Sequence, residues 1–134
     1  MFKLSKKVEY GLIAVKHMAL KGTDMSCSAK EISAEYEIPY DLLSKILQKL
    51  KTEGILTSIQ GMNGGYKLKS KPEKISLASI FNAIEGNTYI LDCGQHDDPD
   101  TCSIYDTCIL SSPLKKVQQS INSYFNKTKL SEIV

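Results

Sequence analysis

One stretch decides the fold predicted for this chain of 134 residues: residues 38–68, IPYDLLSKILQKLKTEGILTSIQGMNGGYKL. Its first half predicts an amphipathic helix, because apolar residues recur there at helical spacing. These residues are Leu42, Leu43, Ile46, Leu47 and Leu50. Pro39 suits the first position of that helix, where its missing N–H group costs nothing. Gly54 is expected just past the helix end, in a left-handed cap.

A hairpin is predicted directly after this helix. Residues 55–59 (ILTSI) are rich in β-branched side chains, and residues 66–68 (YKL) supply a return strand. The loop between them, residues 61–65 (GMNGG), allows positive φ at several positions. A short amphipathic helix followed by a glycine-tipped hairpin is the outline of a winged helix.

The polar side of the same helix suits a surface that reads bases. Ser44 and Gln48 can donate and accept hydrogen bonds, and Lys45 and Lys49 can bind guanine edges or phosphates. A solvated helix face is the commoner meaning of such a pattern. The helix, its stop and the wing occur together in the right order, which favours DNA binding.

Two further helices are expected before this stretch. Ser5 can cap a helix that runs to about Leu20. The capping box of residues 28–31 (SAKE) opens a second helix through about Tyr36. The predicted fold is therefore mainly α with a small β-hairpin wing, a winged helix-turn-helix. Beyond a linker at residues 69–74, residues 75–86 predict one more helix.

A last helix is expected to begin at Ser112 and Pro113. Four of its apolar residues are three, four and three positions apart, and a fifth directly follows the last of them. This spacing is typical of a coiled-coil seam. They are Leu114, Val117, Ile121, Tyr124 and Phe125. We expect this seam to pack partly on its own domain and partly on the same helix of a second subunit, because helix-turn-helix proteins commonly bind twofold sites as dimers. The tail after Lys129 is expected to be loosely held.

Charge divides the chain into two parts. Residues 1–75 hold 13 lysines against 8 acidic residues, and residues 76–134 hold 4 against 7. We expect the first part to be the DNA-binding domain and the second to hold a cysteine loop and the dimerisation helix. All 17 basic residues are lysine, so the two-pronged arginine contact to guanine is excluded.

Several function classes are not expected. The chain has no apolar run of membrane-spanning length, and its first residues lack the apolar segment of a signal peptide. A cytoplasmic protein without a membrane partner is therefore predicted. An enzyme is not predicted, because the sequence shows no nucleophile–base pair and no phosphate-binding signature.

Residues 87–112 show no periodicity, and a loop of that length is usually functional. It carries Cys93, Cys102 and Cys108, whose thiolates could converge on one soft metal or cluster. Their spacing does not match the paired cysteines of zinc ribbons. Three alternatives stay open at this point: unligated cysteines or a disulfide between Cys102 and Cys108, a zinc site, and an iron–sulfur cluster. The fourth-ligand candidates nearby are His96, Asp97 and Asp98.

Two residues outside the loop are given structural roles. We interpret Cys27 as a small buried residue near the second helix. His17 is expected to face outward on the first helix.

The chain resembles the Rrf2 family of bacterial winged-helix regulators, which includes the iron–sulfur cluster regulator and the nitric-oxide-sensitive repressor. The resemblance rests on KLSKKVEYGL, SAKEIS, the helix of residues 38–56, the wing SIQGMNGGYKL, ISLASIFNAIEG and the cysteine loop. It implies a homodimeric transcription factor whose third helix enters the major groove while the wing touches the minor groove.

The resemblance also implies a cofactor. Cys93, Cys102 and Cys108 would ligate a [2Fe–2S] or [4Fe–4S] cluster. Glu9 of the partner subunit, before Tyr10, is the preferred fourth ligand, and His96 is the weaker alternative. The predicted function is DNA-binding regulation in which the cluster senses redox state, nitric oxide or cluster supply. A thiol or zinc sensor on the same scaffold is the alternative, and an iron–sulfur electron carrier is less favoured.

The predicted DNA contacts lie on the second and third helices and on the wing. They are Ser28, Tyr40, Ser44, Lys45, Gln48, Lys49, Ser58, Gln60, Gly61, Asn63, Gly64, Gly65 and Tyr66.

Overall fold

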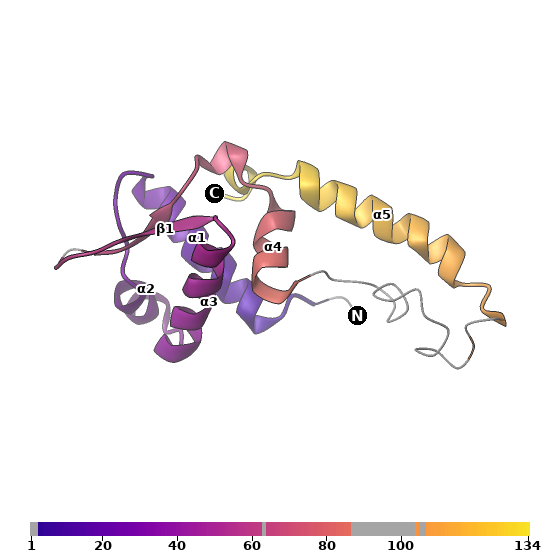
Figure 1. The fold of residues 1–134 in the computed structure, drawn as a ribbon, viewed down its shortest axis with the longest axis horizontal. Coiled ribbons are helices and arrows are strands. Elements are labelled where there is room, and N and C mark those ends of the chain that lie inside the picture. Colours follow the sequence, from indigo (N-terminus) through magenta and orange to yellow (C-terminus); the bar gives the residue numbers. More distant parts are fainter. Residues whose placement is uncertain (1–2, 63, 87–103, 105–106) are drawn as a thin grey trace.

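The computed structural model describes residues 3–62, 64–86, 104 and 107–134. Helices α1, α2, α3 and α4 form the body, and a two-stranded wing projects from one side of it (Figure 1). Helix α5 extends on the opposite side of the body (Figure 1). The elements are α1 (Lys6–Lys21), α2 (Ala29–Tyr36), α3 (Tyr40–Thr52), β1 (Leu56–Ile59), β2 (Gly65–Leu68), η1 (Pro72–Lys74), α4 (Leu77–Glu85), α5 (Ser111–Lys127) and η5 (Leu130–Glu132). The mainly helical winged fold expected from the sequence is confirmed.

Serine side chains begin three of these helices. The hydroxyl oxygens of Ser5, Ser28 and Ser76 each accept a hydrogen bond from the backbone N–H three residues later. Each serine thereby satisfies a donor that the first turn leaves without a partner. The predicted caps of α1 and α2 are confirmed. In α3, Pro39 is the residue before the helix rather than its first position, so that prediction was one residue off.

The apolar face of α3 forms the centre of the core. Leu43, Ile46, Leu47 and Leu50 are at most 2% exposed, whereas Leu42 is only half-buried. Burial of one such side chain contributes about 1.5–3 kcal/mol. Residues of α1 and α4 complete the same core, so it continues past residue 75. The division at that residue stays a prediction about function.

The wing is tied to the segment before α2. Strands β1 and β2 pair antiparallel, with Leu56 opposite Leu68 and Ile59 opposite Gly65. Beyond this ladder, Cys27 and Tyr66 exchange two backbone hydrogen bonds, each of 2.8 Å. A Cβ on Gly65 would lie 2.5 Å from the Cys27 carbonyl oxygen. Glycine is needed there because the two backbones approach so closely.

The end of the chain returns to the core. Leu130 is fully buried, and its N–H donates a hydrogen bond of 2.7 Å to the Ile75 carbonyl. Lys129 forms a β-bridge with Ser76. The prediction of a loosely held tail was wrong, because one apolar side chain and two backbone contacts fix it beside η1 and the start of α4.

Helix α5 begins at Ser111, one residue before the predicted start. Near its other end, the ring of Phe125 packs edge-to-face on Phe81, with ring centroids 4.9 Å apart. That end of α5 is therefore anchored to α4. Among the described residues, every helix is too short or too polar to span a membrane.

Candidate nucleic-acid interface and metal-ligating residues

The exposed side of α3 presents short and long polar side chains together. Lys45 and Gln48 are exposed and Ser44 is half-buried, on the side opposite the core leucines. Tyr40, in the first turn, is 52% exposed. These side chains offer hydrogen-bond donors and acceptors on one face, as contact with base edges and phosphates requires.

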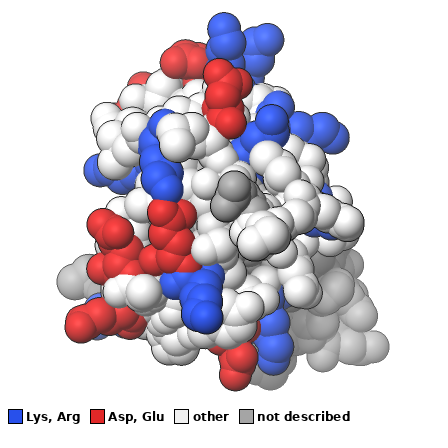
Figure 2. Space-filling model, turned by 90° about the vertical axis from the view of Figure 1, so that its left-hand side faces the viewer, with Lys and Arg blue, Asp and Glu red and all other residues white. Residues whose placement is uncertain are grey.

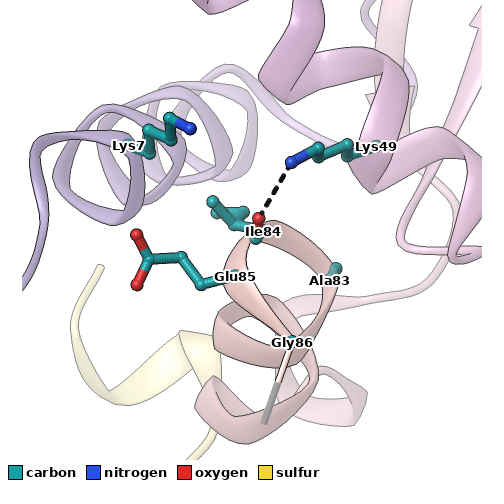
Figure 3. A pocket seen from close by; sticks show the side chains of 6 residues that line it. All are labelled: Lys7, Lys49, Ala83, Ile84, Glu85 and Gly86. Atoms are coloured by element: carbon teal, nitrogen blue, oxygen red, sulfur yellow. Dashed lines mark hydrogen bonds between the residues drawn. The ribbon is translucent and has the colours of Figure 1, made fainter. Parts of the chain in front are cut away.

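Lys49 points elsewhere. Its ammonium donates a hydrogen bond of 3.3 Å to the Ile84 carbonyl at the end of α4 (Figure 3). It lines a shallow cavity of about 400 Å³ with Lys7, Ala83, Ile84, Glu85 and Gly86 (Figure 3). A DNA contact by Lys49 stays a prediction, and it would require the ammonium to leave this carbonyl.

The wing is narrow because of its glycines. Gly61 has a φ of +117°, and a Cβ on Gly64 would lie 2.4 Å from the Ile59 carbonyl oxygen. Ser58 is half-buried, and Gln60 is exposed next to the turn. Asn63 lies outside the described residues. The glycines keep the backbone of this turn narrow, and Met62 adds one large side chain at its tip.

One exposed wing residue was not among the predicted DNA contacts. Met62 at the tip is fully exposed. Large apolar side chains in this position are used by some DNA-binding proteins to press between bases in the minor groove.

The face that carries the wing has mixed charge. Figure 2 shows lysines and acidic residues around a largely uncharged middle. Glu35 and Glu37, which belong to α2 and its end, are exposed. The lysines of the first part of the chain are therefore not gathered into one basic patch on this side.

Ser28 and Tyr66 have structural partners in the fold. The Ser28 hydroxyl accepts the Glu31 N–H at 3.0 Å, and Tyr66 is half-buried where β2 meets Cys27. Both residues lie where the wing and the start of α2 come together. Their DNA contacts stay predictions.

The predicted cluster ligands are only partly described. Cys108 is half-buried three residues before α5, whereas Cys93, Cys102 and His96 lie outside the described residues. Glu9 is half-buried on α1, and its carboxylate binds the Lys6 ammonium at 3.0 Å. That pair is exposed to solvent and therefore weak, so the Glu9 carboxylate could exchange this partner for another. The ligand roles stay predictions.

The apolar seam of α5 is divided between the domain and the solvent. Phe125 packs inward, while Val117 and Tyr124 are 45% and 67% exposed. Leu114 and Ile121 are half-buried. Ile109 and Leu110, just before the helix, are 91% and 53% exposed and extend the apolar surface.

A cluster that the sequence did not predict joins α1, α2 and the segment between them. His17, Cys27 and Glu31 each place one potential ligand atom within 4.8 Å of the others. The prediction that His17 faces outward was wrong: it is half-buried, and its Nδ1 lies 2.8 Å from the Tyr36 hydroxyl. The burial expected of Cys27 is confirmed, since none of its surface is exposed.

Electrostatics differ among the members of this cluster. Burial raises the pKa of the Cys27 thiol. The Lys21 ammonium, which hydrogen-bonds the Glu31 carboxylate, lowers the pKa of that carboxyl, and the Ser28 N–H adds to the effect. Glu31 therefore carries a negative charge beside a neutral thiol.

The comparisons with known proteins agree with this geometry. The family model Rrf2, described as an iron-dependent transcriptional regulator, matches residues 4–134. The transcriptional regulator NsrR of Halalkalibacterium halodurans is 30% identical over 84% of this chain and 76% of its own length. The regulator IscR of Yersinia enterocolitica is 24% identical over 98% of this chain and 79% of its own.

Solved structures show the same fold. CymR, the global cysteine regulator of B. subtilis, superposes with a TM-score of 0.75 at 23% identity, over 99% of this chain and 96% of its own. IscR of T. potens superposes with a TM-score of 0.76 at 23% identity, over 98% of this chain and 85% of its own. With a wing, a helix-turn-helix and a family match over nearly all of its length, this chain belongs to the Rrf2 family of DNA-binding transcriptional regulators.

Proposed function

We propose that this protein is a homodimeric cytoplasmic regulator whose affinity for DNA depends on an iron–sulfur cluster, [2Fe–2S] or [4Fe–4S]. The cluster serves as a sensor of redox state, nitric oxide or cluster supply. One observation carries this proposal: the chain belongs to a family described as iron-dependent regulators and carries Cys93, Cys102 and Cys108 between α4 and α5 in its sequence.

DNA recognition falls to α3 and the wing. Lys45 and Gln48 on the exposed side of α3 contact base edges and phosphates in the major groove. The glycine-rich wing reaches the neighbouring minor groove. With lysine as the only basic residue type, much of the affinity comes from phosphate contacts and falls as salt rises.

The donor set suits iron. Three thiolates are ligands that iron–sulfur clusters prefer, and the Glu9 carboxylate of the partner subunit completes the set. Cys108 is half-buried beside the exposed Ile109 and Leu110, so a second subunit over this apolar surface would shield it from water. When bound, the cluster supplies a group that oxidants and nitric oxide can alter.

The two ends of the cysteine segment suggest how cluster binding could affect the DNA-binding surface. The segment follows Gly86, which lines the same cavity as Lys49 of α3. It ends at Cys108, just before α5. Drawing the three cysteines together would therefore act on both the α3–α4 junction and the dimerisation helix. Two recognition helices bind together only when their separation matches about 34–36 Å or a multiple, so small changes alter affinity.

The solvent-exposed part of the α5 seam supports the proposed dimer. Val117 and Tyr124 stay exposed in the single chain although they lie on the apolar side of the helix. Pairing with α5 of a second copy would bury them.

Anaerobic purification tests the cofactor. We expect a brown protein with visible absorption, and iron and sulfide in equal amounts. Loaded and cluster-free protein should then differ in affinity for a duplex selected from a random pool by the loaded form. Cys102→Ala should abolish both the cluster and this difference. A colourless protein, or a Cys102→Ala variant that keeps the cluster and its effect, would overturn the proposal.

A thiol- or zinc-sensing regulator without a cluster is the second candidate. Thiolates bind zinc as well as iron, and the fold is also that of CymR, named a cysteine regulator. Metal analysis separates the two, because a zinc protein is colourless. An electron carrier is less favoured, since it would have no use for the wing and should show no sequence preference on DNA.

A further inference from the structure

We propose that His17, Cys27 and Glu31 form a binding site for one divalent metal ion of the zinc class, separate from the cysteine segment. The site joins α1, the segment before α2, and α2 itself. Its three potential ligand atoms lie within 4.8 Å of one another. All three residues belong to the described part of the chain, so the site does not require Cys93 or Cys102.

The geometry is close to that of a metal site. Zinc holds nitrogen, sulfur and oxygen ligands at about 2.0–2.3 Å, which puts ligands of one tetrahedral site roughly 3.3–3.8 Å apart. The three atoms therefore need to close by no more than roughly 1.5 Å. The Glu31 side chain, 37% exposed, has the freedom to supply that movement. A water molecule completes the tetrahedron.

The imidazole points independently to a ligand. His17 Nε2 is buried and, within the described part of the chain, lacks a hydrogen-bond partner. A buried polar atom without a partner costs free energy, and bound metal would remove that cost. His17 Nδ1 is already held by the Tyr36 hydroxyl at 2.8 Å. When Nδ1 carries the proton and donates it to Tyr36, Nε2 has its lone pair free for a metal, as in many zinc sites.

The donor set selects the class of metal. One imidazole nitrogen, one thiolate sulfur and one carboxylate oxygen suit a borderline ion such as zinc, whereas magnesium and calcium prefer oxygen alone. Cys27 would bind as the thiolate, and its proton would leave to solvent. A nucleophilic role for this thiol is excluded, because none of its surface is exposed and its burial disfavours the free thiolate.

Lys21 competes for one ligand. Its ammonium hydrogen-bonds Oε1 of Glu31. The carboxylate has two oxygens, so a metal can take the second while Lys21 keeps the first, but two cations beside one carboxylate repel each other. Removing the Lys21 charge should therefore strengthen metal binding, an effect that a purely structural cluster would not show.

Occupancy would affect the DNA-binding surface through the backbone. Cys27 exchanges two hydrogen bonds with Tyr66 of β2, and the next residue, Ser28, caps α2. A metal that holds Cys27 to α1 and α2 would therefore fix the position of the wing relative to the helix-turn-helix.

Cobalt binding to the full-length chain tests the proposal. The parent for the test carries Cys93→Ser, Cys102→Ser and Cys108→Ser, which removes the proposed cluster ligands and leaves this site intact. We expect one Co²⁺ per chain, with a thiolate-to-cobalt charge-transfer band, and displacement of the cobalt by Zn²⁺. In this parent, Cys27→Ala should abolish the band, and His17→Gln or Glu31→Gln should weaken binding at least tenfold. Lys21→Gln should tighten it.

Glu35→Gln is the matched control, because it removes an exposed carboxylate one turn along α2 and should leave the affinity within about twofold. If Cys27→Ala fails to fold, His17→Gln and Glu31→Gln decide the question, since both side chains are only half-buried. A parent that binds no cobalt, or variants that bind as tightly as the parent, would overturn the site. Either result leaves the iron–sulfur proposal untouched, because the parent lacks those cysteines.

Discussion

The Lys49 ammonium of α3 donates a hydrogen bond to the Ile84 carbonyl of α4, 35 positions along the chain. This bond joins the recognition helix to the end of the helix from which the cysteine segment leaves. This hydrogen bond could break and re-form at little cost, since both partners lie at the edge of a shallow cavity.

Lys49→Met should reduce the communication between cluster and DNA. Allosteric couplings are typically about 5–150-fold in affinity. We expect the ratio of dissociation constants for cluster-free and loaded protein to shrink several-fold, while the iron content stays the same. Fluorescence anisotropy with the selected duplex measures both states.

Lys45→Met is the matched control for that prediction. Lys45 is exposed on α3, so its loss should weaken DNA binding by the loaded and the cluster-free protein alike. It should also reduce the slope of log affinity against log salt concentration by about one unit. If the ratio of dissociation constants stays unchanged in Lys49→Met, this hydrogen bond does not couple the cluster to DNA binding.

Gly65→Ala should destabilise the wing. The added Cβ would lie 2.5 Å from the Cys27 carbonyl oxygen, and backbone cannot move aside as a side chain can. Overpacking of this kind costs about 1–3 kcal/mol. Urea denaturation should show a lower midpoint with an unchanged slope, and DNA affinity should fall with it.

Gly11→Ala gives the contrast. Its Cβ would lie 2.3 Å from Ile84 Cδ1, the flexible end of a side chain that can rotate. Alanine also gains about 1 kcal/mol of helix propensity over glycine inside α1. We expect the free energy of unfolding of Gly11→Ala to stay near that of the unaltered chain. If Gly11→Ala and Gly65→Ala lose equal stability, the rigid backbone at Cys27 is not what makes Gly65→Ala unstable.

Val117→Glu should shift the protein from dimer to monomer. Val117 is 45% exposed on the apolar side of α5, and a carboxylate there would be buried without a partner in a dimer. Sedimentation velocity measures the shift. Gln119→Glu adds the same charge at an exposed position of the helix and should leave the dimer intact. Equal behaviour of the two variants would place the dimer contact elsewhere.

Leu130→Ala should lower the free energy of unfolding by about 2–5 kcal/mol, because it removes a fully buried leucine. Chemical denaturation of the single variant gives the value. Val134→Ala, at a position 44% exposed, should change it little. A Leu130→Ala variant as stable as the unaltered chain would mean that the tail does not support the core.

The elements that could be predicted from the sequence depend on neighbours along the chain. The apolar spacing of α3, the serine caps and the glycines of the wing each act within a few residues, so their outcome follows from local rules. The family resemblance then supplied the function. Gly54, expected to be left-handed, has a φ of +83° just after α3.

The misses share a different cause, which is contact between distant segments. The Lys49 side chain points to α4 because its ammonium hydrogen-bonds the Ile84 carbonyl. Leu130 is held at the core because its N–H hydrogen-bonds the Ile75 carbonyl. His17 is half-buried because Tyr36, 19 positions away, lies against its ring. No periodicity in a single helix could reveal these partners.

The paired backbones of Cys27 and Tyr66 give the molecule a means of changing its DNA preference without changing a DNA contact. The wing is held by the segment that connects α1 and α2, and that connection is exposed at Asp24 and Met25. An insertion or deletion there would move the wing against the recognition helix as one unit. In evolutionary terms, the length of this connection would set how far the wing stands from α3, and relatives that differ in it should select differently spaced or differently shaped operators.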